Sequence, residues 1–147
     1  RYGRKSSKPW LPPAPTWAMS ADELQSLFAA LERIFLPRAV ARYIARLVTA
    51  THPRAGEAPP RVRQYVTYGA SPRAAIALAE ASRGVALLAG RPTVGFEDVK
   101  KVYLPALRHR VLLNFEAQAE NIAADVILQE ILAEVKERVA DAPAARK

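Results

Sequence analysis

Apolar residues recur at helical spacing along most of this chain, and this periodicity constrains the fold more than any other feature. From Leu24 to Phe35 they follow an i, i+3, i+4, i+7 pattern, which places them on one face of a helix. Similar spacing returns in four further segments, which begin near Pro37, Ser71, Gly95 and residue 122. No segment alternates apolar and polar residues as a half-buried strand would. The sequence therefore predicts an all-α fold, a helical bundle of about five main helices.

Local signals mark where these helices begin. Ser20 opens a capping box, in which a side-chain oxygen and a following glutamate satisfy free backbone amides. Ser71 and Pro72 fit a helix start, with serine as the cap and proline in the first helical position. We expect a shorter helix over 61–68, a polar connection over 114–120 and a last helix over 122–140.

The ends of the chain differ from this body. Residues 1–19 contain four prolines and two tryptophans, which predicts an extended arm or linker because proline disfavours helix. Residues 20–142 form the predicted helical domain, and 143–147 a flexible tail. No apolar run reaches the roughly 18 to 20 residues of a membrane span. The chain has no cysteine, which excludes disulfides and thiolate metal sites and fits a cytoplasmic protein.

The net charge is +8 and is unevenly distributed. The body is basic, whereas residues 113–142 carry seven acidic and two basic residues. A basic body favours an anionic partner such as nucleotide phosphate, nucleic acid or an acidic neighbouring subunit. On the charge alone, a soluble, arginine-rich surface without any ligand is the simpler explanation.

The sequence lacks the parts of a complete nucleotide-hydrolysing enzyme. Its six glycines are scattered and form no Gly-x-x-x-x-Gly-Lys-Ser/Thr loop, the loop that holds a triphosphate and its magnesium ion. His52 and His109 are far apart in the sequence, so we expect no metal site and no hydrolytic triad. We therefore expect no ATPase activity from this chain alone and no ATP or Mg²⁺ bound to it.

The segment 66–75 carries the strongest functional signal, because it places Arg73 in the first turn of the helix that Ser71 and Pro72 begin. Arginine is always charged, and its planar donors suit phosphate oxygens. The positive end of the helix dipole opposes a cation here, at a cost of up to about 1 kcal/mol. A residue placed against local stability is a candidate functional residue, although a solvated surface arginine is the simpler explanation.

Gly69–Ala74 resembles the sensor-2 motif of MoxR-type AAA+ ATPases. Four further stretches resemble the same family in the same order: Ala86–Arg91, Val94–Val99, Leu104–Arg110 and Asn114–Ala117. The resemblance covers about residues 20–135. It departs from the family pattern at Gly95-Phe96 and at Ala123, where that pattern has better helix-capping residues.

The resemblance implies that residues 20–142 are the helical lid of such an ATPase, packed over ATP and Mg²⁺ in a separate AAA+ core. Arg73, with Ser71 and Pro72 beside it, would contact the ATP phosphate and couple hydrolysis to lid motion. The parent would be a bacterial, cytoplasmic ATPase in a hexameric ring, with its own core and neighbouring subunits as partners. The family implies chaperone-like remodelling or metal-cofactor insertion, and von Willebrand factor A-type partners.

Other residues and functions stay open. Arg61, Arg108, His109 and Arg110 are candidates for the phosphate side or a subunit interface, or for a surface cluster without function. The alternative to a lid is a basic helical domain that binds nucleic acid or only oligomerises, without a catalytic role. Nucleic-acid binding is disfavoured, because no recognition-helix pattern appears and the aromatic residues follow core spacing.

Overall fold

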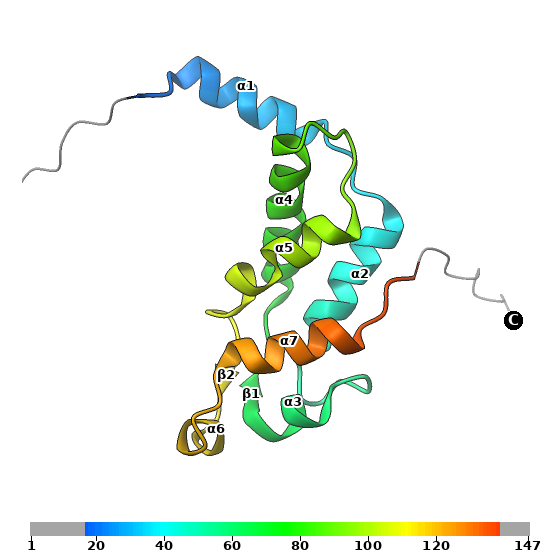
Figure 1. Ribbon diagram of the computed structural model, residues 1–147, viewed down its shortest axis with the longest axis vertical. Helices are drawn as coiled ribbons and strands as arrows, with labels where there is room; N and C mark the ends of the chain where they lie inside the picture. Colours follow the sequence, from blue (N-terminus) through cyan, green and yellow to red (C-terminus); the bar gives the residue numbers. More distant parts are fainter. Residues whose placement is uncertain (1–16, 139–147) are drawn as a thin grey trace, which may run out of the picture.

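The five long amphipathic segments form the main helices of the computed structural model, which describes residues 17–138. These helices are α1 (Ala21–Glu32), α2 (Arg38–Thr49), α4 (Pro72–Leu88), α5 (Phe96–Leu107) and α7 (Ala124–Glu134) (Figure 1). The predicted all-α fold class is therefore confirmed. Most of the predicted arm at 1–19, the end of the last predicted helix and the tail at 143–147 lie outside the described residues.

The central helix is α4, which packs against α1, α2 and α5. Its buried residues are Ala74, Leu78, Ser82 and Ala86. A spacing of four residues aligns them along one face of the helix. Three of the four are small, so neighbouring helices can approach α4 closely.

The core lies where α2 and α5 meet α4 and each other, and where α7 packs against α5. Apolar residues at helical spacing bury one face of each of these helices: Val40, Tyr43, Ile44, Leu47 and Val48 of α2; Val99, Tyr103 and Leu107 of α5; Ile127, Leu128 and Ile131 of α7. The helix α7 lies across the lower part of the molecule, between the main helices and a smaller subdomain (Figure 1). It thereby joins two parts of the chain that are separated in sequence.

The smaller subdomain corrects the prediction that the chain contains no strand. It consists of α3 (Pro60–Tyr65), β1 (Val66–Tyr68), β2 (Leu112–Leu113) and α6 (Phe115–Ala119). The strands pair antiparallel, with Val66 opposite Leu113 and Tyr68 opposite Leu112. Strands of three and two residues are too short to show alternation in the sequence. The helix predicted over 61–68 ends at Tyr65, where the chain extends into β1.

Two further expectations about the C-terminal third were also wrong. The segment 114–120 contains α6, since the Asn114 side chain accepts a hydrogen bond from the Ala117 amide at 2.9 Å and caps a short helix. The last helix ends at Glu134 instead of continuing to 140. Its last turn carries no basic residue to stabilise the helix end.

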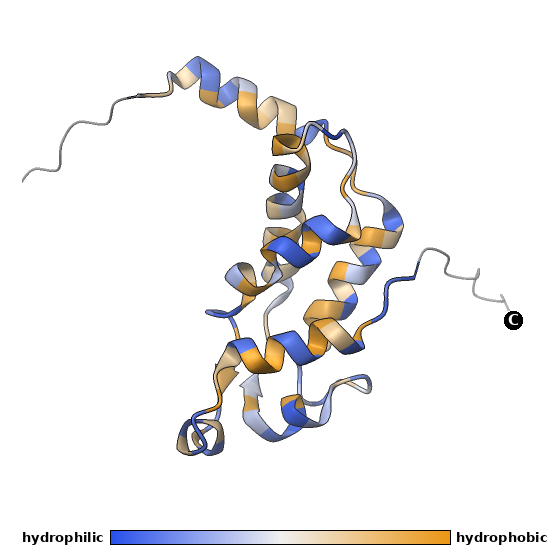
Figure 2. Cartoon of the chain, in the orientation of Figure 1, coloured by the Kyte–Doolittle hydropathy of each residue, from blue (hydrophilic) through white to orange (hydrophobic). Residues whose placement is uncertain are grey.

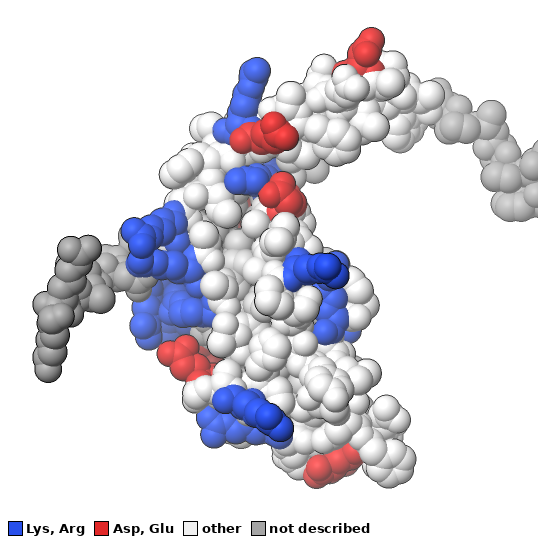
Figure 3. Space-filling model, turned by 180° about the vertical axis from the view of Figure 1, so that it is seen from behind, with Lys and Arg blue, Asp and Glu red and all other residues white. Residues whose placement is uncertain are grey.

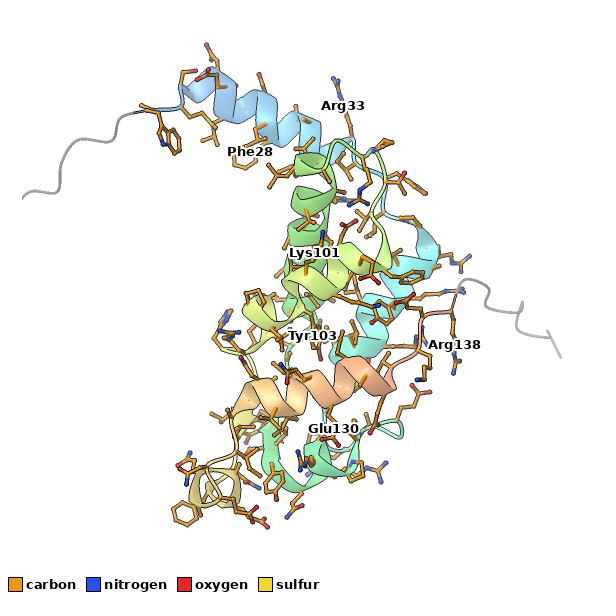
Figure 4. All side chains as sticks on the ribbon, in the orientation of Figure 1. Phe28, Arg33, Lys101, Tyr103, Glu130 and Arg138 are labelled. Atoms are coloured by element: carbon orange, nitrogen blue, oxygen red, sulfur yellow. The ribbon has the colours of Figure 1, made fainter. Side chains whose placement is uncertain are left out.

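The helix α1 projects from the end of α4 (Figures 1 and 2). Its start is as predicted, because Ser20 and Glu23 form a complete capping box. However, no residue of α1 is buried, and Leu24, Leu27 and Phe28 are 42%, 37% and 55% exposed. Figure 4 shows Phe28 on the side of α1 that lies next to the end of α4. The apolar face of α1 is thus left largely uncovered by the described residues.

Candidate functional site

The start of α4 places Arg73 at the surface. Ser71 occupies the N-cap position with extended backbone angles, and Pro72 is the first helical residue, as the sequence predicts. Ser71, Pro72 and Arg73 are all exposed, whereas Ala74 is fully buried. The first turn of α4 is therefore anchored by Ala74, while the Arg73 side chain faces solvent.

The Arg73 guanidinium has no ion pair or side-chain hydrogen bond within residues 17–138. The first turn of α4 contains no acidic residue that could neutralise it. The Ser71 hydroxyl does not cap the helix, contrary to the expectation from its position. A free guanidinium at the positive end of a helix has the donors and the charge to bind an anion such as phosphate.

The loop that precedes α4 is held by the turn that follows α2. The Ala70 amide donates a hydrogen bond to the Thr51 hydroxyl at 2.9 Å. The Ala70 carbonyl lies 2.9 Å from Nε2 of His52, and since a carbonyl only accepts, Nε2 carries the proton in this contact. Both backbone groups of Ala70 are therefore satisfied by residues 18 and 19 positions earlier.

A pocket of about 290 Å³ opens beside this loop, lined by His52, Pro53, Arg54, Thr67, Tyr68 and Gly69. A smaller hollow of about 200 Å³ also has His52 in its wall, together with Pro72. The 68% exposed Tyr68 ring and the exposed Arg54 give the first pocket an aromatic surface and a cation. The surface around the start of α4 is therefore hollowed and carries positive charge.

The other predicted site residues belong to different surroundings. Arg61 lies 3.7 Å from Glu130 of α7, and Arg108 lies 2.9 Å from Asp125 of α7. Figure 4 shows Glu130 on the side of α7 that faces α3. His109 and Arg110 follow α5 and are exposed. Arg61 and Arg108 thus lie next to carboxylates of α7, in partly exposed ion pairs that form without a ligand.

The acidic C-terminal segment is paired with the basic body of the same chain. In addition to the two ion pairs above, Lys100 lies 2.6 Å from Glu137, and Arg46 donates to the Lys136 carbonyl at 2.8 Å. The hydrogen bonds to Glu137 and Glu97 raise the pKa of Lys100. The uneven charge seen in the sequence therefore serves, in part, to hold α7 and the following residues across the fold.

Lysine and arginine gather on the rear face of the molecule (Figure 3). The helix α2 carries Arg38, Arg42 and Arg46 and has no acidic residue in its first turn. Among residues 17–138, no group of three or more histidine, aspartate or glutamate side chains is arranged to hold a metal ion. In the same part of the chain, no helix has the length and apolar character needed to cross a membrane.

Sequence reasoning missed Thr51 and His52. Both lie in a turn without a recognisable motif, and their partner Ala70 lies 19 and 18 positions away. Gly69 was recognised as part of the sensor-2 motif, but the sequence did not show that its lack of a side chain allows the close approach of this turn. Such a long-range contact leaves no periodic signal in the sequence.

Comparison with known proteins gives a consistent picture. The AAA lid domain family model matches residues 59–131. Chaperone MoxR1 of Mycobacterium tuberculosis is 32% identical over 121 residues, which are 82% of this chain and 32% of that protein. The protein YeaC of Bacillus subtilis is 34% identical over 124 residues, which are 78% of this chain and 36% of that protein.

The same relationship appears in three dimensions. A crystal structure of a proposed ATPase from Cytophaga hutchinsonii superimposes with a TM-score of 0.75 at 33% identity, over 80% of this chain and 36% of that one. The chain therefore spans about a third of the length of the proteins that it matches.

Proposed function

Because this chain belongs to the AAA lid domain family and is a lid of the MoxR type, we propose that Arg73 is its sensor-2 arginine. In this proposal the guanidinium contacts a phosphate of ATP bound in the core domain of the full-length protein. The observation that carries it is the position of Arg73, which is exposed at the start of α4 and has no ion pair with any residue in the described range 17–138. A guanidinium held by an internal carboxylate could not serve this role.

The contribution of Arg73 is electrostatic. Its donors would stabilise negative charge on the phosphate as the bond to the leaving group breaks, without transferring a proton. ATP, when bound, supplies the phosphoryl group that is transferred to water. The chain fits such an anion through the Arg73 guanidinium at the positive end of α4. The phosphate-binding loop and the Mg²⁺ ligands would come from the core, because the sequence contains no such loop.

Charge on the phosphate would also couple the nucleotide to the position of the lid. Arg73 is fixed to α4, and α4 contacts α1, α2 and α5. An attraction between the guanidinium and the terminal phosphate would therefore draw the whole helical domain toward the core. Loss of that phosphate after hydrolysis removes the attraction and frees the lid.

The similarity to a MoxR-type chaperone supports a proposal about the wider role of the full-length protein. We propose that the full-length protein is a cytoplasmic bacterial ATPase that forms hexameric rings. We propose for it a chaperone-like activity, consistent with the name of its relative Chaperone MoxR1, and partners that include von Willebrand factor A-type proteins. Insertion of metal cofactors into client proteins belongs to the same proposal.

ATP turnover by the full-length protein tests the role of Arg73. We expect Arg73→Ala to lower turnover by roughly 10²-fold, the usual effect of removing one group that stabilises transition-state charge. Arg38→Ala is the matched control, because Arg38 is also an exposed arginine in the first turn of a helix that follows a proline. Unchanged turnover in Arg73→Ala would exclude Arg73 from the mechanism. We expect no turnover from the chain without its core.

A further inference from the structure

Two residues outside the sensor-2 motif, Thr51 and His52, fix the loop that leads into α4. The Thr51 side chain is fully buried, and its hydroxyl has a partner on each side. It donates to the Val48 carbonyl at 2.6 Å and accepts from the Ala70 amide at 2.9 Å. Since a hydroxyl has one proton to donate, these two bonds fix its orientation. Thr51 therefore joins the end of α2 to the loop before α4.

His52 completes this contact from the other side. Its Nε2 donates to the Ala70 carbonyl at 2.9 Å, so the amide and the carbonyl of Ala70 are both held by the 51–52 turn. Ala70 itself is fully buried and lies three residues before Arg73. We refer to this arrangement of Thr51, His52 and Ala70 as the Thr51–Ala70 contact.

Gly69 permits the close approach that the contact requires. A Cβ atom at this position would lie 2.7 Å from both the carbonyl oxygen and the hydroxyl oxygen of Thr51, and 2.8 Å from Cγ of His52. Two of these three atoms are in the Thr51–Ala70 contact, and the third is backbone, so a side chain could be accommodated only by moving the loop. Position 69 therefore needs a residue without a side chain, so that the loop can lie this close to Thr51 and His52.

The start of α4 depends on this contact because its own cap is incomplete. The Ser71 hydroxyl makes no hydrogen bond to the first turn of the helix. The path of the chain into α4 is instead fixed by Ala70 before the turn and by the buried Ala74 after it. Arg73 lies between these two anchors, so a shift of the loop would move the base of its side chain.

From this geometry we infer that Thr51, together with Gly69, is a positioning residue that aims Arg73 at the nucleotide. This inference rests on the proposed function of Arg73. Neither residue would touch ATP, and both act through the backbone of the loop. Because a displacement of about 1 Å can lower a rate by 10²-fold, the contact would affect turnover without changing the chemistry.

The experiment measures ATP turnover by the full-length protein in two backgrounds, one with Arg73 and one with Arg73→Ala. Thr51→Val keeps the size of the side chain but removes the hydroxyl, and Thr51→Ser keeps the hydroxyl. Gly69→Ala disturbs the same contact while retaining both hydrogen-bonding partners, so the test does not depend on one variant folding. Gly84→Ala is its control, because a Cβ there meets no atom within 4 Å. Thr93→Val, at an exposed position beyond the other end of α4, is the control for Thr51→Val.

With Arg73 present, we expect Thr51→Val and Gly69→Ala to lower turnover by roughly 10-fold or more, and Thr51→Ser to restore most of it. In the Arg73→Ala background we expect the same changes to have less than about a 2-fold effect, because the group that they position is already missing. A purely structural role would lower turnover equally in both backgrounds.

Three outcomes would overturn the inference. Equal losses in the two backgrounds would show that the contact does not act through Arg73. Normal turnover in Thr51→Val and Gly69→Ala, with a loss in Arg73→Ala, would remove the positioning role and leave the proposed function intact. Normal turnover in Arg73→Ala would remove the proposed function, and the inference with it.

Discussion

The Arg91 guanidinium donates two hydrogen bonds to the Asp98 carboxylate, at 2.9 and 2.5 Å, and the Asp98 side chain is only 1% exposed. Asp98 also accepts from the Gly95 amide at 2.8 Å. It therefore supplies a helix cap at Gly95, a residue whose lack of a side chain predicted a weak start for α5. The hydrogen bonds from Arg91, and after them that from Gly95, hold the pKa of Asp98 below its ordinary value of 3.8.

Neutralising Asp98 should destabilise the fold. We expect Asp98→Asn to lower the free energy of unfolding at pH 7 by roughly 1.5–3 kcal/mol, the usual range for hydrogen bonds to a charged group. Glu97→Gln is the matched control, because the neighbouring Glu97 side chain is 75% exposed in its ion pair with Lys100 and should contribute less than about 1 kcal/mol. Urea unfolding of the isolated chain measures both, and equal effects would contradict this account.

The contribution of Asp98 to the free energy of unfolding should decrease as the pH falls. Its pKa is lower in the folded than in the unfolded state, so folding favours the ionised carboxylate. This stabilisation is complete well above pH 3.8 and is lost as the pH falls through 3.8 toward the lower pKa of the folded state. The difference in unfolding free energy between the wild type and Asp98→Asn should therefore shrink on acidification. A difference that grows below pH 4 would refute the assignment.

Two buried tyrosines should respond in opposite ways to loss of the hydroxyl. The Tyr103 hydroxyl is buried and has no hydrogen-bond partner among residues 17–138, and burial raises its pKa. Tyr103→Phe should leave stability unchanged or raise it by up to about 2 kcal/mol, because an unsatisfied polar group is removed. Tyr65 instead donates to Glu120 at 2.8 Å, so Tyr65→Phe should cost about 1–2 kcal/mol. Thermal unfolding of both variants measures whether the two substitutions change the stability of the fold in opposite directions.

The helix α1 should contribute little to the stability of the isolated chain. Phe28 is 55% exposed, whereas Leu78 of α4 is fully buried. We expect Phe28→Ala to change the free energy of unfolding by about 0.5 kcal/mol or less, and Leu78→Ala to lower it by roughly 2–5 kcal/mol. A large loss in Phe28→Ala would show that α1 packs more closely against the body than the structure shows.

Periodicity was sufficient to predict the five main helices, because each has at least three turns over which an apolar face can repeat. It could not reveal β1 and β2, which are too short to alternate, or α6, whose five residues give little more than one turn. Periodicity also identifies an apolar face without showing what covers it. The face of α1 was therefore recognised, but its exposure was not.

The candidate site was predictable only in part, for a related reason. Ser71, Pro72 and Arg73 are adjacent in the sequence, so a local motif identifies them together. Thr51 and His52 are separated from this motif along the chain by α3 and β1, and no local pattern links them to Ala70. The pairing of Arg61 and Arg108 with α7 is likewise a tertiary contact between distant segments.

The basic surface should not bind duplex DNA tightly at physiological salt. Arg61, Arg91 and Arg108 are engaged by carboxylates of the chain. Tyr43, Tyr65 and Tyr103 are buried and so cannot stack on bases, whereas Tyr68 is exposed beside Arg54. We expect a dissociation constant no tighter than about 10⁻⁵ M at 0.15 M salt, within the non-specific range. Affinity in the nanomolar range that weakens steeply with salt would favour the nucleic-acid-binding alternative.

The most direct test of the central claim compares the affinities of the full-length protein for ADP and for a non-hydrolysable ATP analogue, with and without Arg73. If Arg73 contacts the terminal phosphate, Arg73→Ala should weaken binding of the ATP analogue by about 10-fold or more and change ADP affinity by less than about 2-fold, while Arg38→Ala changes neither. Unaltered affinity for the ATP analogue, or an equal loss for both nucleotides, would contradict a contact between Arg73 and that phosphate.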